Sequence, residues 1–168
     1  MEVRLADCAG FCFGVKRAVD TVYEQLKNGK TIYTYGPIVH NEEVVRELSE
    51  KGVRVLENKE ELKHLKAGEN IPTVIIRAHG VAKEIYDIME ANGLECIDAT
   101  CPFVKKIHRI VEQKSTEGYH VIVVGDPKHP EVEGIVGGSR YRSGDSGSGR
   151  KFCKNRRRKT LYCFSDDI

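Results

Sequence analysis

Two cysteines and three histidines stand where the side chains of an α/β protein carry out chemistry, each directly after a predicted strand. Cys12 lies in Ala-Gly-Phe-Cys-Phe-Gly-Val, and Cys101 lies in Asp-Ala-Thr-Cys-Pro. His40, His79 and His129 lie in Val-His-Asn, Ala-His-Gly and His-Pro-Glu-Val-Glu-Gly. Soft thiolates together with imidazoles favour a redox metal centre that has an anionic substrate beside it.

Both thiols are expected at the start of a helix, where backbone amides favour the thiolate that ligates metal. Pro102 fits the first helical position, which places Cys101 near the N-cap. The alternative for either thiol is a buried structural cysteine, and Cys96, inside the preceding strand, is expected in the core. The absence of a Cys-x-x-Cys pair excludes a zinc ribbon. An iron–sulfur cluster tolerates scattered ligands, although it normally takes four cysteines.

Glu131 follows His129 by two residues in the loop Pro-Lys-His-Pro-Glu-Val-Glu-Gly. A carboxyl group there can donate a proton while His129 holds the carboxyl group or a diphosphate. A solvated loop face explains the two glutamates equally well. His79 follows an apolar strand and favours ligand binding, whereas His40 fits an ordinary surface histidine as well as a ligand.

Strand and helix patterns alternate along the first 137 residues. The apolar run at 73–78 is typical of a parallel strand, and helical spacing marks 14–28 and 82–90. Repeated units of this length predict the α/β class, with a parallel sheet whose ligands bind outside the carboxyl ends of its strands. The other expected elements are strands at 3–6, 31–35, 53–56, 95–98 and 120–124, and helices at 41–49, 59–65 and 104–111.

The composition is that of a soluble globular protein, with 40% hydrophobic and 31% charged residues in a chain of 168. No apolar run is long enough to span a bilayer, and the N-terminus has no signal-peptide core. We therefore expect a cytoplasmic protein without membrane contact, whose six cysteines stay reduced.

The last 31 residues differ in composition from the rest of the chain. Residues 138–168 are Gly/Ser-rich and then basic, with 9 Lys or Arg against 3 Asp or Glu. This composition predicts a disordered tail. A nucleic-acid-binding module built on residues 151–159 is the less favoured interpretation, because no aromatic platform accompanies the charge. We expect no nucleic-acid partner.

Five segments together resemble the hydroxymethylbutenyl diphosphate reductase family, which catalyses the last step of non-mevalonate isoprenoid biosynthesis. They are Gly-Phe-Cys-Phe-Gly-Val-Lys-Arg-Ala, Val-His-Asn, Ala-His-Gly-Val, Asp-Ala-Thr-Cys-Pro-Phe-Val and His-Pro-Glu-Val-Glu-Gly. Each segment alone would be weak evidence for the family, but five segments in the family's order make the resemblance specific. The resemblance covers residues 1–137.

This resemblance implies a cofactor, a substrate and a role for each matching residue. The family holds a 4Fe-4S cluster with three cysteines and reduces 4-hydroxy-3-methylbut-2-enyl diphosphate to isopentenyl and dimethylallyl diphosphate. Its two electrons come from a ferredoxin or flavodoxin. The matching residues are Cys12 and Cys101 for the cluster, His40, His79 and His129 for the substrate diphosphate, and Glu131 for the proton. The third cluster ligand is not identifiable.

The resemblance also implies a fold of three similar α/β units around a central cluster. We expect a first complete unit at residues 1–100, an incomplete second unit at 101–137 and an unmatched tail at 138–168. A chain that carries only this much looks truncated and is expected to be inactive alone. The alternative function is a zinc-dependent hydrolase that uses His40, His79, His129 and Glu131.

Overall fold

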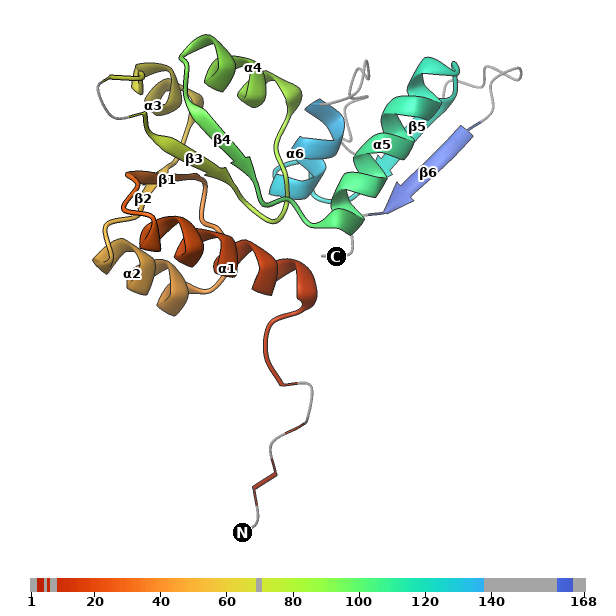
Figure 1. Cartoon of the computed structure of the whole chain (residues 1–168). Coiled ribbons are helices and arrows are strands. Elements are labelled where there is room, and N and C mark those ends of the chain that lie inside the picture. The colour runs from red at the N-terminus through yellow and green to blue at the C-terminus, as the bar shows by residue number, and fades with distance from the viewer. Residues whose placement is uncertain (1–2, 5, 7–8, 69–70, 138–159, 165–168) are drawn as a thin grey trace.

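A four-stranded parallel sheet, in the order β2-β1-β3-β4, organises the larger part of the molecule (Figure 1). Its strands are β1 (Ile32–Tyr35), β2 (Arg54–Leu56), β3 (Thr73–Ile76) and β4 (Glu95–Asp98). The computed structural model describes residues 3–4, 6, 9–68, 71–137 and 160–164. The α/β class with a parallel sheet, predicted from the sequence, is confirmed.

Helices cover both faces of this sheet. The helices α1 (Phe13–Lys27) and α2 (Glu42–Glu50) lie on one face, and α3 (Lys59–His64) and α4 (Lys83–Ala91) lie on the other (Figure 1). Every residue of β3 is buried, as expected for a strand that is covered on both sides.

Alternation along β3 assigns its side chains to two separate cores. Ile75 belongs to a cluster with Ala18 and Val22 of α1. Val74 and Ile76 belong to the other cluster, which contains the following side chains of α3 and α4: Leu62, Ile85 and Met89. The sheet is therefore held from both sides, and its strand ends have fixed positions.

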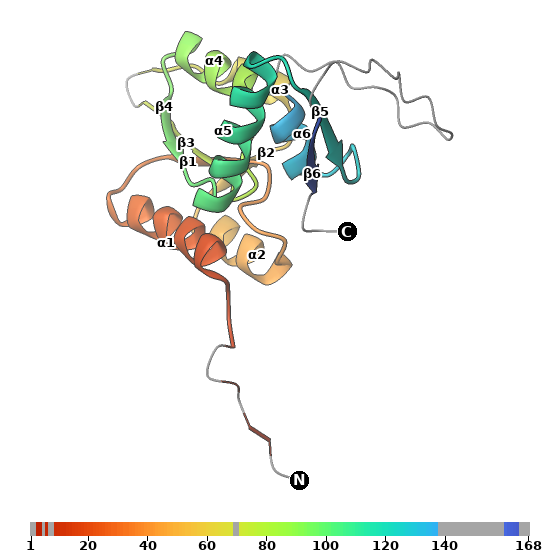
Figure 2. The ribbon, with the colours of Figure 1, turned by 90° about the vertical axis from the view of Figure 1, so that its right-hand side faces the viewer.

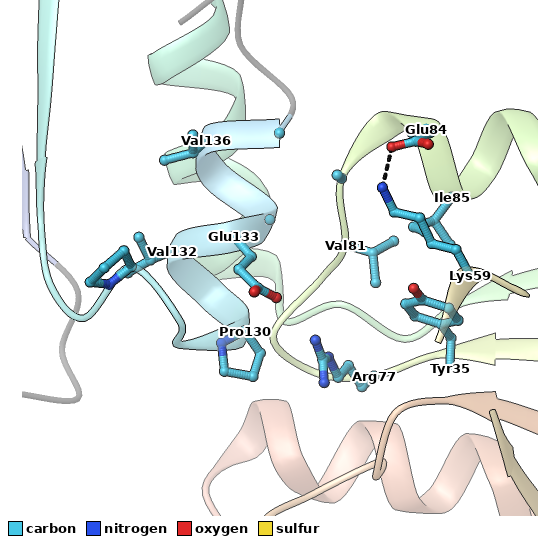
Figure 3. Close-up of a pocket in the computed structure, with 14 residues that line it drawn as sticks. Tyr35, Lys59, Arg77, Val81, Glu84, Ile85, Pro130, Val132, Glu133 and Val136 are labelled. Atoms are coloured by element: carbon cyan, nitrogen blue, oxygen red, sulfur yellow. Dashed lines mark hydrogen bonds and ion pairs between the residues drawn. The ribbon is translucent and has the colours of Figure 1, made fainter. Parts of the chain in front are cut away.

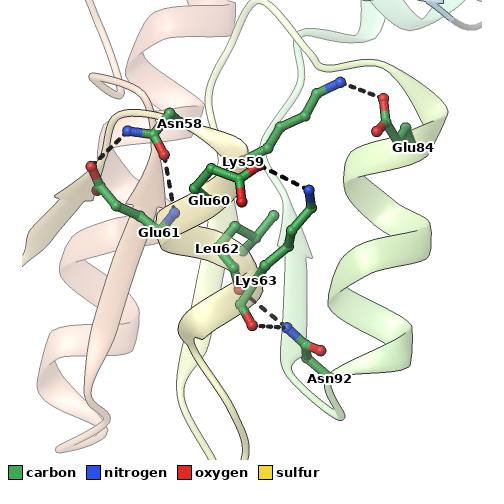
Figure 4. A network of polar contacts seen from close by, with 8 residues as sticks. All are labelled: Asn58, Lys59, Glu60, Glu61, Leu62, Lys63, Glu84 and Asn92. Carbon is green, nitrogen blue, oxygen red and sulfur yellow. Dashed lines mark hydrogen bonds and ion pairs between the residues drawn. The ribbon is translucent and has the colours of Figure 1, made fainter.

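Polar contacts fix α3 against α4 (Figure 4). Asn58 caps the start of α3 by accepting from the Glu61 amide at 3.0 Å. Asn92 Nδ2, just after α4, donates to the carbonyl groups of Leu62 and Leu65 at 3.2 and 3.0 Å. Between the helices, Lys59 forms an ion pair with Glu84.

The remaining elements form a smaller part beside the sheet (Figure 2). They are α5 (Pro102–Thr116), β5 (His120–Val124), α6 (Pro130–Gly137) and β6 (Thr160–Phe164). The strands β5 and β6 pair in parallel, and Val111, Val121 and Ile135 form the core.

Three expectations from the sequence are wrong. In the segment 3–6, the described residues Val3, Arg4 and Ala6 form no strand, because no described strand pairs with them and Val3 is 83% exposed. Cys96 lies in β4 as expected but is exposed rather than in the core, because β4 is an edge strand.

The third correction concerns the tail. Residues 160–164 form β6 instead of being disordered, because their β-branched and aromatic residues favour a strand and β5 offers a free edge. The rest of the predicted disordered tail, at 138–159 and 165–168, lies outside the described residues.

Candidate functional site at the strand ends

The two cysteines singled out in the sequence both occupy N-cap positions. Cys12 is the N-cap of α1 and Cys101 is the N-cap of α5, and neither side chain caps its helix by a hydrogen bond. Cys12 is exposed, and Cys101 is partly buried. Each cysteine therefore lies at the N-terminal end of a helix, beside the first free backbone amides of that helix.

Gly14 brings the Cys101 thiol onto the first turn of α1. A Cβ atom at position 14 would lie 2.6 Å from Cys101 Sγ and 3.1 Å from Cys101 Cβ. Only glycine leaves this space free, so the second glycine of Gly-Phe-Cys-Phe-Gly serves the approach of α5 to α1. Cys101 thus comes close to the helix turn that Cys12 begins.

Arg17 connects α1 to the end of β4 through two hydrogen bonds. Its guanidinium donates from Nη1 to the Thr100 carbonyl at 3.2 Å and from Nη2 to the Asp98 carbonyl at 3.3 Å. The Asp98 carboxylate in turn accepts from the Thr100 amide at 2.9 Å and pairs with Lys105 at 2.6 Å.

Two opposing effects act on the pKa of Asp98. Burial raises it, but the hydrogen bonds from Lys105 and Thr100 outweigh burial, so the pKa lies below its usual value. The turn that presents Cys101 is therefore held by a charged carboxylate.

The three histidines of the predicted site form one cluster. The ring centroids of His40 and His79 are 4.6 Å apart, those of His79 and His129 are 5.8 Å apart, and those of His40 and His129 are 6.2 Å apart. They come from the segments after β1, β3 and β5, which are far apart in the chain. The parallel topology places all three at carboxyl ends of strands, where ligands bind.

A backbone hydrogen bond joins the turn of His79 to Cys101. The Cys101 amide donates to the carbonyl of Ala78 at 2.9 Å, directly before His79. His79 and Cys101 therefore lie at the ends of the neighbouring strands β3 and β4.

Glu131 is a buried carboxyl group in the first turn of α6. Only 7% of Glu131 is exposed, so the solvated loop face that the sequence left open does not hold for Glu131, although Glu133 is exposed. Its backbone amide donates to His129 Nδ1 at 3.3 Å, so a neutral His129 ring carries its proton on Nε2. His129 in turn donates its amide to the Asp126 carbonyl at 2.9 Å. The loop is thus shaped to present a buried carboxyl group beside an imidazole.

His108 also belongs to this region, although its sequence has no glycine-flanked motif and favours an ordinary histidine. A Cβ atom at either Gly80 or Gly134 would lie 3.2 Å from His108 Cε1, so the ring fills the space between the His79 turn and α6. Burial lowers the pKa of His108, and the nearby Asp98 carboxylate opposes this only partly. The one available signal was its spacing, two helical turns after Cys101.

The donor atoms at this rim fit part of an iron–sulfur site. Cys12 and Cys101 supply two sulfur atoms at helix N-termini, and Gly14 leaves room for the Cys101 side chain there. Within the described part of the chain, no three His, Cys, Asp or Glu side chains are placed to ligate one metal ion. A third protein ligand is therefore not found among these residues.

Fold and site together define a parallel α/β protein that carries three imidazoles at its strand ends and two thiols at helix N-termini. The family model of the LytB protein matches residues 3–144, and the chain belongs to this family.

Named relatives agree with this assignment. A 4-hydroxy-3-methylbut-2-enyl diphosphate reductase from Caldanaerobacter subterraneus subsp. tengcongensis is 51% identical over 139 residues, which are 82% of this chain and 47% of the relative. A 4-hydroxy-3-methylbut-2-enyl diphosphate reductase from Geobacter sp. (strain M21) is 49% identical over 136 residues, which are 81% of this chain and 46% of that relative.

Two solved structures share the fold. One is a structure of (E)-4-hydroxy-3-methyl-but-2-enyl diphosphate reductase, described as the terminal enzyme of the non-mevalonate pathway. It matches with a TM-score of 0.66 and 47% identity over 79% of this chain and 45% of its own. The other is a structure of the E-1-hydroxy-2-methyl-but-2-enyl-4-diphosphate reductase from Plasmodium falciparum. It matches with a TM-score of 0.77 and 30% identity, and the match covers 96% of this chain and 50% of the solved chain.

The chain spans about half the length of the curated relatives that it matches. No helix in the described part of the chain has the length and apolar character needed to cross a membrane. The relatives carry reductase names, so the zinc-dependent hydrolase is not favoured.

Proposed function

We propose that this chain forms the substrate-binding and proton-donating part of a 4-hydroxy-3-methylbut-2-enyl diphosphate reductase. The observation that carries the proposal is the cluster of three imidazoles, 4.6–6.2 Å apart, at strand ends that adjoin two N-cap thiols. The relatives' names supply the substrate, and the cytoplasm is the compartment that we propose.

His40, His79 and His129 bind the diphosphate in this proposal. Imidazole N–H groups donate to phosphate oxygens, and protonation adds charge complementarity. Their rings lie within 6.2 Å of one another, close enough for one diphosphate to meet all three. The allylic carbon chain then extends toward the thiols at the neighbouring strand end.

Cys12 and Cys101 hold the iron–sulfur cluster with a third ligand from outside the described residues. When bound, the 4Fe-4S cluster passes on electrons that a ferredoxin or flavodoxin delivers. Replacing the allylic hydroxyl group by hydrogen takes two electrons and two protons, and water leaves. Glu131 delivers a proton to the departing oxygen, and His129 fixes the helix turn that presents its carboxyl group.

We further propose that two thiolates alone do not sustain turnover, since a cluster of this kind is normally held by more cysteines. The remaining ligand then comes from a segment such as the second half of the longer relatives. In this proposal the imidazoles bind the substrate without the cluster, whereas reduction needs the complete cluster.

Binding of inorganic diphosphate to the 168-residue chain tests the imidazole assignment. Isothermal titration calorimetry should show binding that His79→Ala weakens by about tenfold or more, because a charge-assisted hydrogen bond is lost. The matched control is His64→Ala on α3, an exposed histidine outside the cluster. Equal affinity of the His79→Ala and unmutated chains would remove the diphosphate from this cluster.

Anaerobic reconstitution with iron and sulfide tests the cluster assignment separately. We expect the 168-residue chain to bind iron through Cys12 and Cys101 without product formation from reduced donor and substrate. Cys12→Ser and Cys101→Ser should each reduce the iron content, whereas Cys96→Ser should not. A stable 4Fe-4S cluster with measurable product from the chain alone would show that the prediction is wrong and that the tail supplies the third ligand.

A further inference from the structure

A cavity of about 470 Å³ lies between α6 and the sheet, apart from the imidazole cluster (Figure 3). None of the three clustered histidines lines it. Its walls come from the end of β1, the segment after β3, the starts of α3 and α4, and one side of α6. A cavity of this size accommodates a small organic molecule.

Arg77 is the cavity's cation closest to the sheet. It directly follows β3, and its side chain points between Tyr35 and Glu133 (Figure 3). A Cβ atom at position 36 would lie 2.5 Å from Arg77 Nη1, so Gly36, with φ of +71°, makes room for the guanidinium group. The fold thus holds this cation at a fixed place beside the cavity.

The polar atoms of Arg77 are incompletely satisfied. Its Nε is buried and has no hydrogen-bond partner, and within the described ranges no carboxylate forms an ion pair with it. Burial lowers the pKa of Arg77, and the charge of Glu133 counteracts this only partly. A half-buried cation without an ion-pair partner is stabilised by any anion that reaches it.

The other polar groups of the cavity differ in how they can interact with a ligand. Burial raises the pKa of Tyr35, so its hydroxyl group stays protonated and can donate. Lys59 is already paired with Glu84 at the rim. Glu133 is exposed and faces Arg77 across the cavity (Figure 3).

The rest of the lining is mostly apolar. Val81 and Ile85 contribute from the α4 side, and Val132 and Val136 contribute from α6. Apolar walls around one cation favour a ligand with an apolar body and an anionic head. Glu133 repels further negative charge, so a singly charged head fits better than a diphosphate.

We propose that this cavity binds a small monocarboxylate, whose head group lies between Arg77 and Tyr35 and whose short apolar body packs against α4 and α6. The guanidinium fork and the tyrosine hydroxyl group match the oxygens of one carboxylate. This site is separate from the proposed diphosphate site, and its test does not depend on reductase activity.

Hexanoate is the probe, and the test uses the 168-residue chain. Ligand-observed NMR should show binding of hexanoate, much weaker binding of n-hexanol, which lacks the charge, and no competition by inorganic diphosphate. Arg77→Met keeps the apolar stem and removes the charge, so it should weaken hexanoate binding by about tenfold or more. The control is Arg109→Met, an exposed arginine on α5 away from the cavity.

Two milder variants keep the test decisive if Arg77→Met does not fold. Tyr35→Phe should weaken hexanoate binding several-fold, and Glu133→Gln should strengthen it because a repulsive charge is removed. Unchanged binding in Tyr35→Phe, weaker binding in Glu133→Gln, or competition between hexanoate and diphosphate would overturn the proposal. His79→Ala should leave hexanoate binding intact, which separates this proposal from the proposed function.

Discussion

Gly14 and Cys101, 87 positions apart in the chain, are in direct contact: a Cβ atom at position 14 would lie 2.6 Å from the Cys101 thiol. This one relationship explains the second glycine of Gly-Phe-Cys-Phe-Gly. It also shows how two distant cysteine motifs reach one place, since α5 can begin beside α1 only if α1 has no side chain there.

Substitution of Gly14 tests this contact directly. Gly14→Ala should lower the free energy of unfolding by about 1–3 kcal/mol, because the added methyl group overpacks a closed site. Urea denaturation provides the measurement. Gly68→Ala is the matched control, since a Cβ atom at position 68 meets nothing within 4 Å. A Gly14→Ala variant as stable as the control would contradict the contact.

Removal of the Glu131 proton should slow turnover without loss of the cluster. Glu131→Gln, made in a version extended to the length of the relatives, keeps the side-chain shape and should reduce kcat by about 10²–10⁴-fold. The visible spectrum of the cluster should be unchanged. Glu90→Gln, at an exposed position on α4, is the control. Turnover within a factor of two of the unmutated enzyme would assign the proton to another group.

His108 should make the folded state sensitive to acid. Burial lowers its pKa below the usual 6.5, so the unfolded chain takes up a proton more readily than the folded chain. The neutral His108 ring therefore makes its full contribution to the stability of the folded state above pH 6.5. This contribution is lost as the pH falls from 6.5 through the lower pKa of the folded state.

Thermal unfolding between pH 8 and pH 5 measures this effect. The Tm of the unmutated chain should fall more steeply with acid than that of His108→Gln. The exposed His64→Gln should keep the slope of the unmutated chain. Equal slopes for His108→Gln and the unmutated chain would show that another group causes the acid sensitivity.

Cys96 should be a slow thiol although the residue is exposed. Desolvation, and then the Asp98 carboxylate, raise its pKa to about 11. About one thiol in a thousand is then ionised at pH 8, roughly a hundredfold less than for the ordinary value of 9.0. Iodoacetamide labelling followed by peptide mapping should show slow modification of Cys96 at pH 8 and a steep rise toward pH 11. Fast labelling at pH 8 would contradict the raised pKa.

Much of the fold could be predicted from local patterns. The apolar run that contains β3 and the helical spacing of α1 and α4 reflect burial that repeats with the period of each element. The predicted strand at 3–6 failed because strand propensity says nothing about whether a partner strand is available. The opposite error occurred at β6, where β5 supplies a partner to a segment that was expected to be disordered.

The sequence by itself determined which residue types stand in chemically suggestive motifs: Cys12, Cys101, the three histidines and Glu131 were singled out there as candidates. Only the tertiary structure decided which of these groups meet, that Glu131 is buried, and that His108 and Arg77 matter. The physical reason is the separation along the chain of the residues that come into contact. Motifs and periodicity record contacts between near neighbours in the chain. The His40–His79–His129 cluster and the Gly14–Cys101 contact arise from parallel crossovers that bring distant strand ends to one edge.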